Sequence, residues 1–410
     1  MGYLVSASFS TRQILFAKQS ESRQNGDESV LMKKILIAGW GIGYPEGGGV
    51  QWFGMQYVAG LRALGLEVFW LDLLGSDRVE EHSLTPEAMI DLFRPQFDRF
   101  GLGDRWVVRY EDKISTRFFG MTEARLHGLC TDCDLLINLS GHLQDDELLR
   151  RIKRRAYFDL DPGFTQIWAH QVNMRLERFN LFFTVGLNVG KPEFAIPTRG
   201  IAWQPFVPPV SLVDWPVQTQ APSLPFTTVG QWRGEFASWE NQYYGPKSDE
   251  FLQLIELPRK TSQPLELALL IHPTETEDIE KLQAHGWILK DPYQVACGID
   301  GFQRYVQQSR GEFSVAKSAY VRLRSGWFSD RTVCYLASGR PALVQETGFG
   351  DHIPTGQGLL TFRTIDDAAR GLDEIAANYE EHSIAARRIA EEVFAAPKVM
   401  HSIIARAGIS

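Results

Sequence analysis

Strand-like and helix-like segments alternate along most of this sequence, and this alternation constrains the fold more than any other feature. The apolar run KILIAG (34–39) is followed by helically spaced apolar residues up to Leu64 and then by the run EVFWLDL (67–73). Strand, helix and strand in direct succession predict a right-handed parallel crossover, with the loop after the first strand at the carboxyl edge of the sheet. The series continues with strand-like runs at 106–110, 133–140, 156–161 and 181–186.

A proline-rich stretch at 203–225 interrupts the alternation, which then begins again. Strand-like runs return at 226–232, 265–271, 287–292, 311–317, 341–346 and 358–362, with helical patterns near 248–256, 275–285 and 330–338. A chain of 410 residues also exceeds what one hydrophobic core usually supports. The expected fold class is therefore α/β, with two doubly wound Rossmann-like domains facing a cleft. The expected parts are a disordered N-terminal extension (1–31), an N-terminal domain (32–205), a linker (206–225), a C-terminal domain (226–390) and a C-terminal helix (391–410).

Composition narrows the possible partners. The net charge of -8 argues against nucleic acid, and no apolar stretch is long enough to span a membrane. Four cysteines are too few for a disulfide scaffold at this length, which fits a reducing cytoplasm. Cys130 and Cys133, with His127 nearby, supply half of a zinc site at most, and chance spacing is the simpler interpretation. We expect a soluble cytoplasmic protein that uses no metal.

A glycine-rich loop, GWGIGYPEGGGVQWFGM (39–55), follows the first strand. A dinucleotide fingerprint is one interpretation, because Asp72 ends the second strand where a ribose-binding acid would stand. The spacing argues against it. Tyr44 occupies the place of the third glycine, and the insertion YPE would hold a pyrophosphate away from the helix that opens at Gly47, Gly48 and Gly49.

Three stretches resemble GT-B glycosyltransferases. GGGVQWFGMQYVAGLRALGLEVFWLDL (47–73) resembles their first crossover, CYLASGRPALVQETG (334–348) their helix-turn-strand at the donor site, and VGQWRGEFASWENQYYGPKSDEF (229–251) the loop after the first donor-domain strand. The resemblance implies that the C-terminal domain binds a nucleoside-diphosphate sugar and the N-terminal domain binds the acceptor. In that family the loop at 47–49 borders the acceptor and the reaction centre.

The resemblance also implies donor-binding residues. Arg233 and Lys247, in the loop that begins near Gly230, would face the diphosphate, whose developing charge needs cations and free amides. Helix amides at Ser329, Asp330 and Arg331 could cradle phosphate, although capping alone explains Ser329 or Asp330. Glu346, Thr347 and Gly348 could contact sugar hydroxyls, or form a tight turn. Retaining members carry two glutamates where Gly326 and Cys334 stand here, so Asp330 or Glu346 could supply the substitute carboxylate.

Three residues are candidates for catalysis. Asp161 ends a strand before Pro162 and could deprotonate an acceptor hydroxyl, but it could equally cap the next helix. His142 follows another strand and could contact sugar or acceptor hydroxyls, or be a plain surface residue. Glu46 in the glycine loop is the rival base, and an exposed turn residue is the alternative. A cluster of cations, Lys317, Arg322 and Arg324, is most simply a solvated face.

Together these features predict a hexosyltransferase-type glycosyltransferase. It would move a sugar from a nucleoside-diphosphate sugar, as co-substrate, to a small-molecule, lipid or glycan acceptor, with no other cofactor and no catalytic metal. A nucleotide-sugar epimerase of the same fold and a non-catalytic sugar- or nucleotide-binding module are the alternatives. The sequence leaves the acceptor, the sugar, the stereochemistry and the oligomeric state open.

Overall fold

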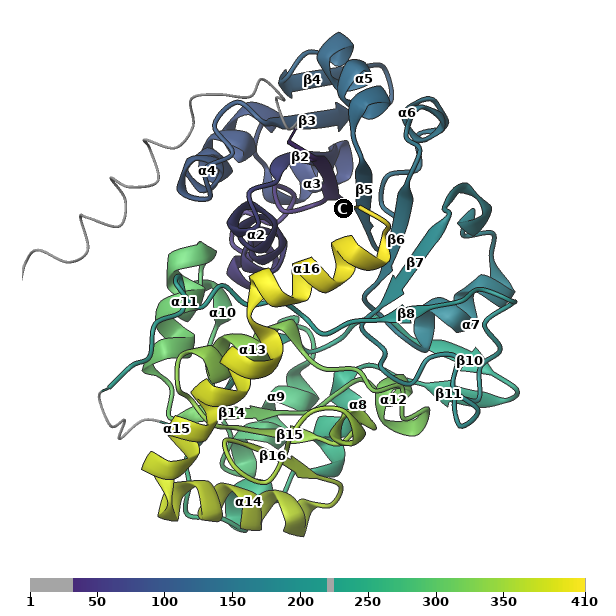
Figure 1. Ribbon diagram of the computed structural model, residues 1–410. Helices are drawn as coiled ribbons and strands as arrows, with labels where there is room; N and C mark the ends of the chain where they lie inside the picture. The colour runs from purple at the N-terminus through teal and green to yellow at the C-terminus, as the bar shows by residue number, and fades with distance from the viewer. Residues whose placement is uncertain (1–31, 220–224, 410) are drawn as a thin grey trace, which may run out of the picture. The chain divides into compact units, whose positions relative to one another are not determined.

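The structure is a computed structural model that describes residues 32–219 and 225–409 (Figure 1). The described residues from Lys33 onward belong to one compact unit. The expected extension at 1–31, and residues 220–224 of the expected linker, lie outside the described residues.

The first half of this unit is built on an eight-stranded sheet with strand order β4-β3-β2-β1-β5-β6-β7-β8. Every neighbouring pair is parallel except β3 and β4. The strand order reverses between β1 and β5, so a ligand crevice is expected at the carboxyl ends of these strands. The strands are β1 (Lys34–Gly39), β2 (Glu67–Gly75), β3 (Trp106–Glu111), β4 (Thr116–Gly120), β5 (Leu135–Leu139), β6 (Arg155–Asp159), β7 (Leu181–Thr184) and β8 (Gln204–Pro205).

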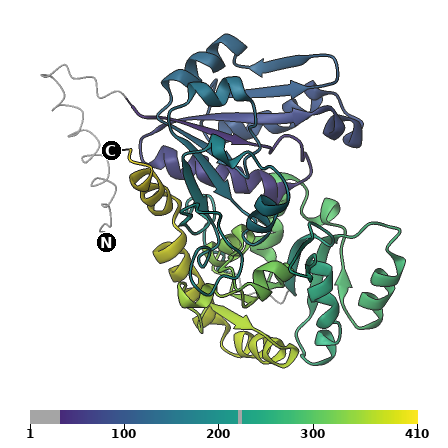
Figure 2. The ribbon, with the colours of Figure 1, turned by 90° about the vertical axis from the view of Figure 1, so that its right-hand side faces the viewer.

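The second half is built on a six-stranded, all-parallel sheet with strand order β13-β12-β9-β14-β15-β16. Its order reverses between β9 and β14, which gives a second crevice of the same kind. Figure 2 shows the purple and blue strands of the first half above the green strands of the second half. The strands are β9 (Phe226–Gln231), β12 (Leu265–Leu270), β13 (Ile288–Leu289), β14 (Gly311–Ser314), β15 (Ala342–Gln345) and β16 (Leu359–Phe362).

Helices connect the parallel strands and cover the sheets. Strands β1, β5 and β15 are buried almost throughout, which explains why they read as continuous apolar runs in the sequence. In the first half the helices are α2 (Gly48–Ala63), α3 (Ser76–His82), α4 (Pro86–Arg99), α5 (Glu123–Asp132), α6 (Asp146–Arg151) and α7 (Phe164–Gln171). In the second half they are α8 (Lys247–Gln253), α9 (Thr276–Ala284), α10 (Pro292–Val295), α11 (Gly298–Gln308), α12 (Ser318–Arg322), α13 (Asp330–Ala337), α14 (Ile365–Ala377) and α15 (Tyr379–Ile389).

Two elements differ from the sequence expectation. The aromatic stretch after β9, expected to be a loop, contains the hairpin β10 (Ala237–Trp239) and β11 (Gln242–Tyr244), because Glu240 and Asn241 adopt the positive φ angles that such tight turns require. The strand expected at 287–292 is shortened to β13, because Asp291 caps α10 and Pro292 opens it.

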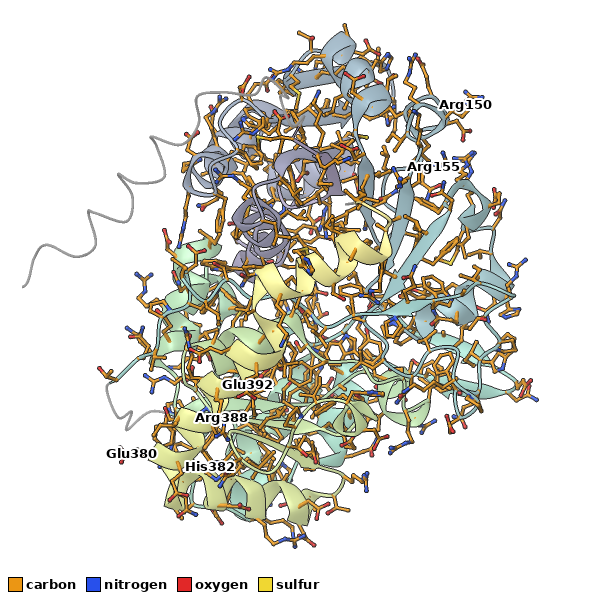
Figure 3. All side chains as sticks on the ribbon, viewed as in Figure 1. Arg150, Arg155, Glu380, His382, Arg388 and Glu392 are labelled. Atoms are coloured by element: carbon orange, nitrogen blue, oxygen red, sulfur yellow. The ribbon has the colours of Figure 1, made fainter. Side chains whose placement is uncertain are left out.

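The chain crosses between the halves twice, and the two crossings are joined to each other. The N–H of Val210 donates to the carbonyl of Phe394 (2.8 Å), and the N–H of Ala396 donates to the carbonyl of Val210 (2.9 Å). The second crossing runs through the π-helix η4 (Ala390–Phe394), where Glu392 is labelled in Figure 3. The expected boundary between 390 and 391 therefore falls inside a continuous helical segment.

The last helix, α16 (Ala396–Arg406), lies against α2 of the first half (Figure 1). The contact is close because residue 60 of α2 is glycine. A Cβ at Gly60 would lie 2.7 Å from Cγ of Met400 and 2.8 Å from the carbonyl oxygen of Ala396. The C-terminal helix is thus tied to the first half by a contact that tolerates no added atom at this position.

We expect Gly60→Ala to destabilise the protein although alanine favours helices, because the added methyl collides with backbone that cannot move aside. The expected loss is about 1–3 kcal/mol, measured as a lower Tm. Gly128 in α5 is the matched control, because a Cβ there has no atom within 4 Å. Gly128→Ala should raise stability by about 0.5–1 kcal/mol. Equal effects of the two substitutions would contradict this account of the α2–α16 contact.

Candidate functional site

A pocket of about 390 Å³ lies where the carboxyl ends of both sheets meet. The first half contributes the residues after β1 and β6, the glycine loop, and parts of α2 and α3. The second half contributes the end of β9, the starts of α8 and α13, and parts of α10, α11 and α12. Aromatic side chains form much of the wall: Trp40, Tyr44, Trp52, Phe53, Tyr293, Phe302, Tyr320 and Trp327. We refer to it as the cleft pocket.

The glycine loop lines this pocket and also joins the two halves. A Cβ at Gly48 would lie 2.0 Å from the carbonyl oxygen of Gly298 and 2.6 Å from Cβ of Phe302, both on α11. The carbonyl of Glu46 accepts the N–H of Gly298 (2.9 Å). Gly47, Gly48 and Gly49 all line the pocket. The close passage of α2 and α11 therefore requires glycine here, which accounts for a spacing that fits no dinucleotide fingerprint.

Lys247, the first residue of α8, places a cation in the cleft pocket. Among the residues that the structure describes, none forms a hydrogen bond or ion pair with its ammonium group, and the nearest aromatic ring is that of Trp327 (5.9 Å from Nζ to the centroid). Burial, reinforced by the nearby charges of Arg331 and Lys317, lowers the pKa of Lys247 to about 7. A desolvated, unpaired cation beside an open pocket is the feature expected of a site that receives an anion.

Arg233 does not share this position, contrary to the sequence expectation. Its guanidinium donates to Asp278 Oδ2 (2.8 Å) and to Ser248 Oγ (2.9 Å), and it also pairs with Glu275. It does not belong to the lining of the cleft pocket. Arg233 thus forms ion pairs with acidic residues at the start of α9. The other two cations with permanent charge that line the pocket beside Lys247 are Lys317 and Arg331.

The start of α13 forms the floor beside Lys247. Ser329 caps the helix, with Oγ accepting the N–H of Arg331 (3.2 Å), as expected for a capping residue. Arg331 donates to Glu312 Oε1 (2.6 Å) and to the carbonyl of Val229 (2.9 Å), so much of its charge is already paired. Asp330 lines the pocket, and burial raises its pKa. Gly230, at the end of β9, also lines the pocket.

Glu346, Thr347 and Gly348 are buried and do not line the cleft pocket. Thr347 Oγ1 donates to the carbonyl of Trp327 (2.6 Å). Asn188 of the first half donates to the carbonyl of Gly348 (3.1 Å), whose φ of 90° marks a tight turn. The segment forms a turn held in the contact between the halves, and its contact with sugar hydroxyls stays a prediction.

Asp161 lines the cleft pocket at the end of β6. Its Oδ1 accepts hydrogen bonds from Lys317 Nζ (2.7 Å) and from Tyr320 OH (2.5 Å), both of the second half. Burial alone would raise the pKa of Asp161, but Lys317 and Tyr320 outweigh it, so the pKa lies below its usual value. Helix α7 begins after Gly163, so Asp161 is not its N-cap residue.

The other two catalytic candidates lie apart from each other. Glu46 lines the pocket and faces His82, with 3.3 Å between Oε2 and Nδ1. His142 is not among the lining residues, but its ring packs at a tilt against Trp40, which lines the pocket (4.1 Å between the ring centroids). His142 is an exposed residue, and partial desolvation of its imidazole lowers its pKa.

Sequence reasoning missed the role of Lys317 and the aromatic wall. Lys317 looked like one of three solvated cations, yet it joins Asp161 and Glu235 across the cleft. The aromatic residues come from loops and helices of both halves, so no spacing in the sequence groups them. The place of Trp40 in the site could have been predicted from the sequence, because Trp40 directly follows a strand at the ligand-binding edge of the sheet.

No cluster of three or more metal-ligating side chains occurs within residues 32–219 and 225–409. Burial raises the pKa values of Cys130 and Cys133 to about 12, so both are thiols at pH 7. None of the described helices is long and apolar enough to cross a membrane.

No protein-family model matches the sequence, and the curated proteins include no match. Solved structures do match. An alpha-glucosyltransferase in complex with UDP aligns with a TM-score of 0.54 and 13% identity, over 92% of this chain and 100% of its own. The pneumococcal O-GlcNAc transferase GtfA, in complex with UDP and GlcNAc, gives 0.55 and 11% over 92% and 99%. Anabaena HepE in complex with UDP-glucose gives 0.53 and 13% over 92% and 99%. The chain therefore has the GT-B fold, and the expected fold class is confirmed.

The unpaired charge of Lys247 should cost stability, which gives a test that needs no ligand. Lys247→Met removes the charge and should raise stability by about 1 kcal/mol or more, or about 2–4 °C in Tm. The lysine is charged in the unfolded chain up to its ordinary pKa of 10.5 and in the folded protein only below about 7. The gain is therefore full below pH 7 and declines toward pH 10.5. Exposed Lys113→Met is the control and should show neither effect.

Proposed function

We propose that this chain is a glycosyltransferase that transfers a sugar from a nucleoside-diphosphate sugar to an acceptor bound in the same cleft, without a metal. The observation that carries the proposal is the unpaired ammonium of Lys247, in a pocket lined by both halves of a GT-B fold. Each of the three solved structures named above holds UDP or UDP-glucose. A uridine nucleotide is therefore the first donor to test.

The second half supports donor binding through charge. A leaving diphosphate gains negative charge as the glycosidic bond breaks, and preorganised cations stabilise that charge. Lys247 supplies an uncompensated cation, and Arg331 with the first amides of α13 lies beside it. Phosphate binding would return the pKa of Lys247 toward its ordinary value, because an anion would replace the lost solvation.

The first half supports acceptor binding through its aromatic and acidic side chains. Trp40, Tyr44 and Phe53 offer flat apolar surfaces to a sugar ring or another planar acceptor. Asp161 is our candidate base for the acceptor hydroxyl. Its pairing with Lys317 keeps it ionised but weakens it as a base, so we infer that donor phosphate draws Lys317 away and restores the basicity of Asp161. Glu46 remains the rival base, and His142 would contact hydroxyls from the edge of the site.

Lys247→Gln should weaken UDP binding at least tenfold, because it removes a charge-assisted contact to phosphate. Arg233→Gln should change UDP affinity by less than twofold, because that guanidinium is already held by Glu275 and Asp278. Isothermal titration calorimetry of both variants provides the measurement. A crystal of the complex with the nucleotide against residues 39–49, and nothing bound near Lys247, would overturn the proposal.

Asp161→Asn should lower kcat by about 10²–10⁴-fold with little change in the donor KM, if Asp161 is the base. Glu46→Gln is the matched control and should retain most of kcat. The assay follows UDP release with a panel of acceptors. The reverse pattern would assign the base to Glu46. Conversion of the donor with no acceptor present, followed by NMR, would favour an epimerase instead, and tight UDP binding without turnover would favour a binding module.

A further inference from the structure

A second pocket, of about 500 Å³, lies where the chain crosses between the two halves. We refer to it as the hinge pocket. None of its lining residues belongs to the cleft pocket. The lining residues come from the segments after β7 and β8, from the turn after β15, and from η4 and α16. They include Lys191, Lys398 and Arg406, with Phe206 and Val399 at the apolar wall.

The hinge pocket is strongly positive in a protein whose net charge is -8. Lys191, Lys398 and Arg406 line it, together with His352, and no aspartate or glutamate does. Within the described part of the chain, none of the three permanent cations forms an ion pair. This distinguishes them from several surface arginines, which pair with carboxylates three or four residues away.

The contacts of these cations leave their charge uncompensated. Lys191 Nζ lies 3.0 Å from Asn188 Oδ1 and 2.8 Å from His352 Nε2. Arg406 donates to the carbonyl of Pro205 (2.7 Å), and Lys398 donates to the carbonyl of Glu392. All of these acceptors are neutral. Partial burial lowers the pKa of Arg406, which is the cost of holding a cation with no anion beside it.

The rest of the pocket is apolar. Leu187, Phe206 and Val399 are buried, and Val207 and Val393 are half-buried at its wall. A volume of this size suits a small organic molecule rather than a single ion. Three cations from two segments, Lys191 after β7 and Lys398 and Arg406 on α16, suit an oxyanion that carries more than one negative charge, as a phosphate monoester does. The ligand that satisfies both features has a phosphate head and an apolar body.

We propose that the hinge pocket binds an amphipathic phosphate monoester, with the phosphate held by Lys191, Lys398 and Arg406 and its apolar body against Phe206 and Val399. This inference does not depend on the proposed transfer reaction. The same chemistry occurs in a dissolved alkyl phosphate and in a phospholipid headgroup at a membrane surface, and the two sources are separated by the test.

The probes are octyl phosphate below its micelle concentration, inorganic phosphate, octanol, and vesicles that contain phosphatidic acid. Calorimetry should show saturable 1:1 binding of octyl phosphate, at least tenfold tighter than inorganic phosphate or octanol, because only octyl phosphate uses both halves of the pocket. Absence of octyl phosphate binding would overturn the proposal. If vesicles bind as well, and octyl phosphate competes with them, the site also accepts a membrane lipid.

Lys191→Gln/Lys398→Gln removes two exposed charges with little effect on packing and should weaken octyl phosphate binding at least tenfold. The matched control, Lys113→Gln/Arg304→Gln, removes two exposed cations elsewhere and should bind as the wild type does. Arg406→Lys keeps the charge and should retain most of the affinity. A crystal of the complex should place the phosphate at the hinge pocket. Equal affinity of the two double variants, or phosphate beside Lys247 instead, would overturn the assignment.

Discussion

Helix α2 is held by the second half of the chain at both of its ends, and the two-sheet arrangement depends on this contact. Near its start, Gly48 passes close to the backbone of α11, and near its end, Gly60 passes close to the backbone of α16. Both contacts are too tight for a side chain. Because α2 follows the glycine loop directly, the same contacts fix the position of the loop at the cleft pocket. The contacts that pack α2 against α11 and α16 therefore also position the glycine loop at the cleft pocket.

The cations around the cleft differ in whether a carboxylate pairs with them. Arg233 and Arg331 have carboxylate partners, and Lys317 bridges the halves through Asp161 and Glu235. Lys247 alone among the cleft cations faces the pocket without such a partner in the described residues. Lys247 is half-buried, and an unpaired charge that is partly removed from water lowers the stability of the folded state. An anion bound in the pocket would supply the missing interaction, which is why we propose the donor site there.

The sequence anticipated most elements of both sheets, because parallel strands buried on both faces appear as continuous apolar runs. It also placed Lys247, Asp161 and the glycine loop near one edge, since the carboxyl ends of parallel strands converge. It did not anticipate the ion pairs of Arg233 or the burial of Glu346, Thr347 and Gly348. The carboxylates of α9 lie far along the chain from Arg233, and Asn188 lies far from Gly348, so local patterns contain no sign of either contact.

The sequence by itself determined the two α/β halves, the break between them and the strand ends from which a site could be built. These follow from local periodicity, which depends on neighbouring residues. Only the tertiary structure decided which cations are neutralised, which turns are buried and where the two crossings meet at Val210. Those outcomes depend on distances between groups that are remote in sequence, and electrostatic and packing energies are set by those distances.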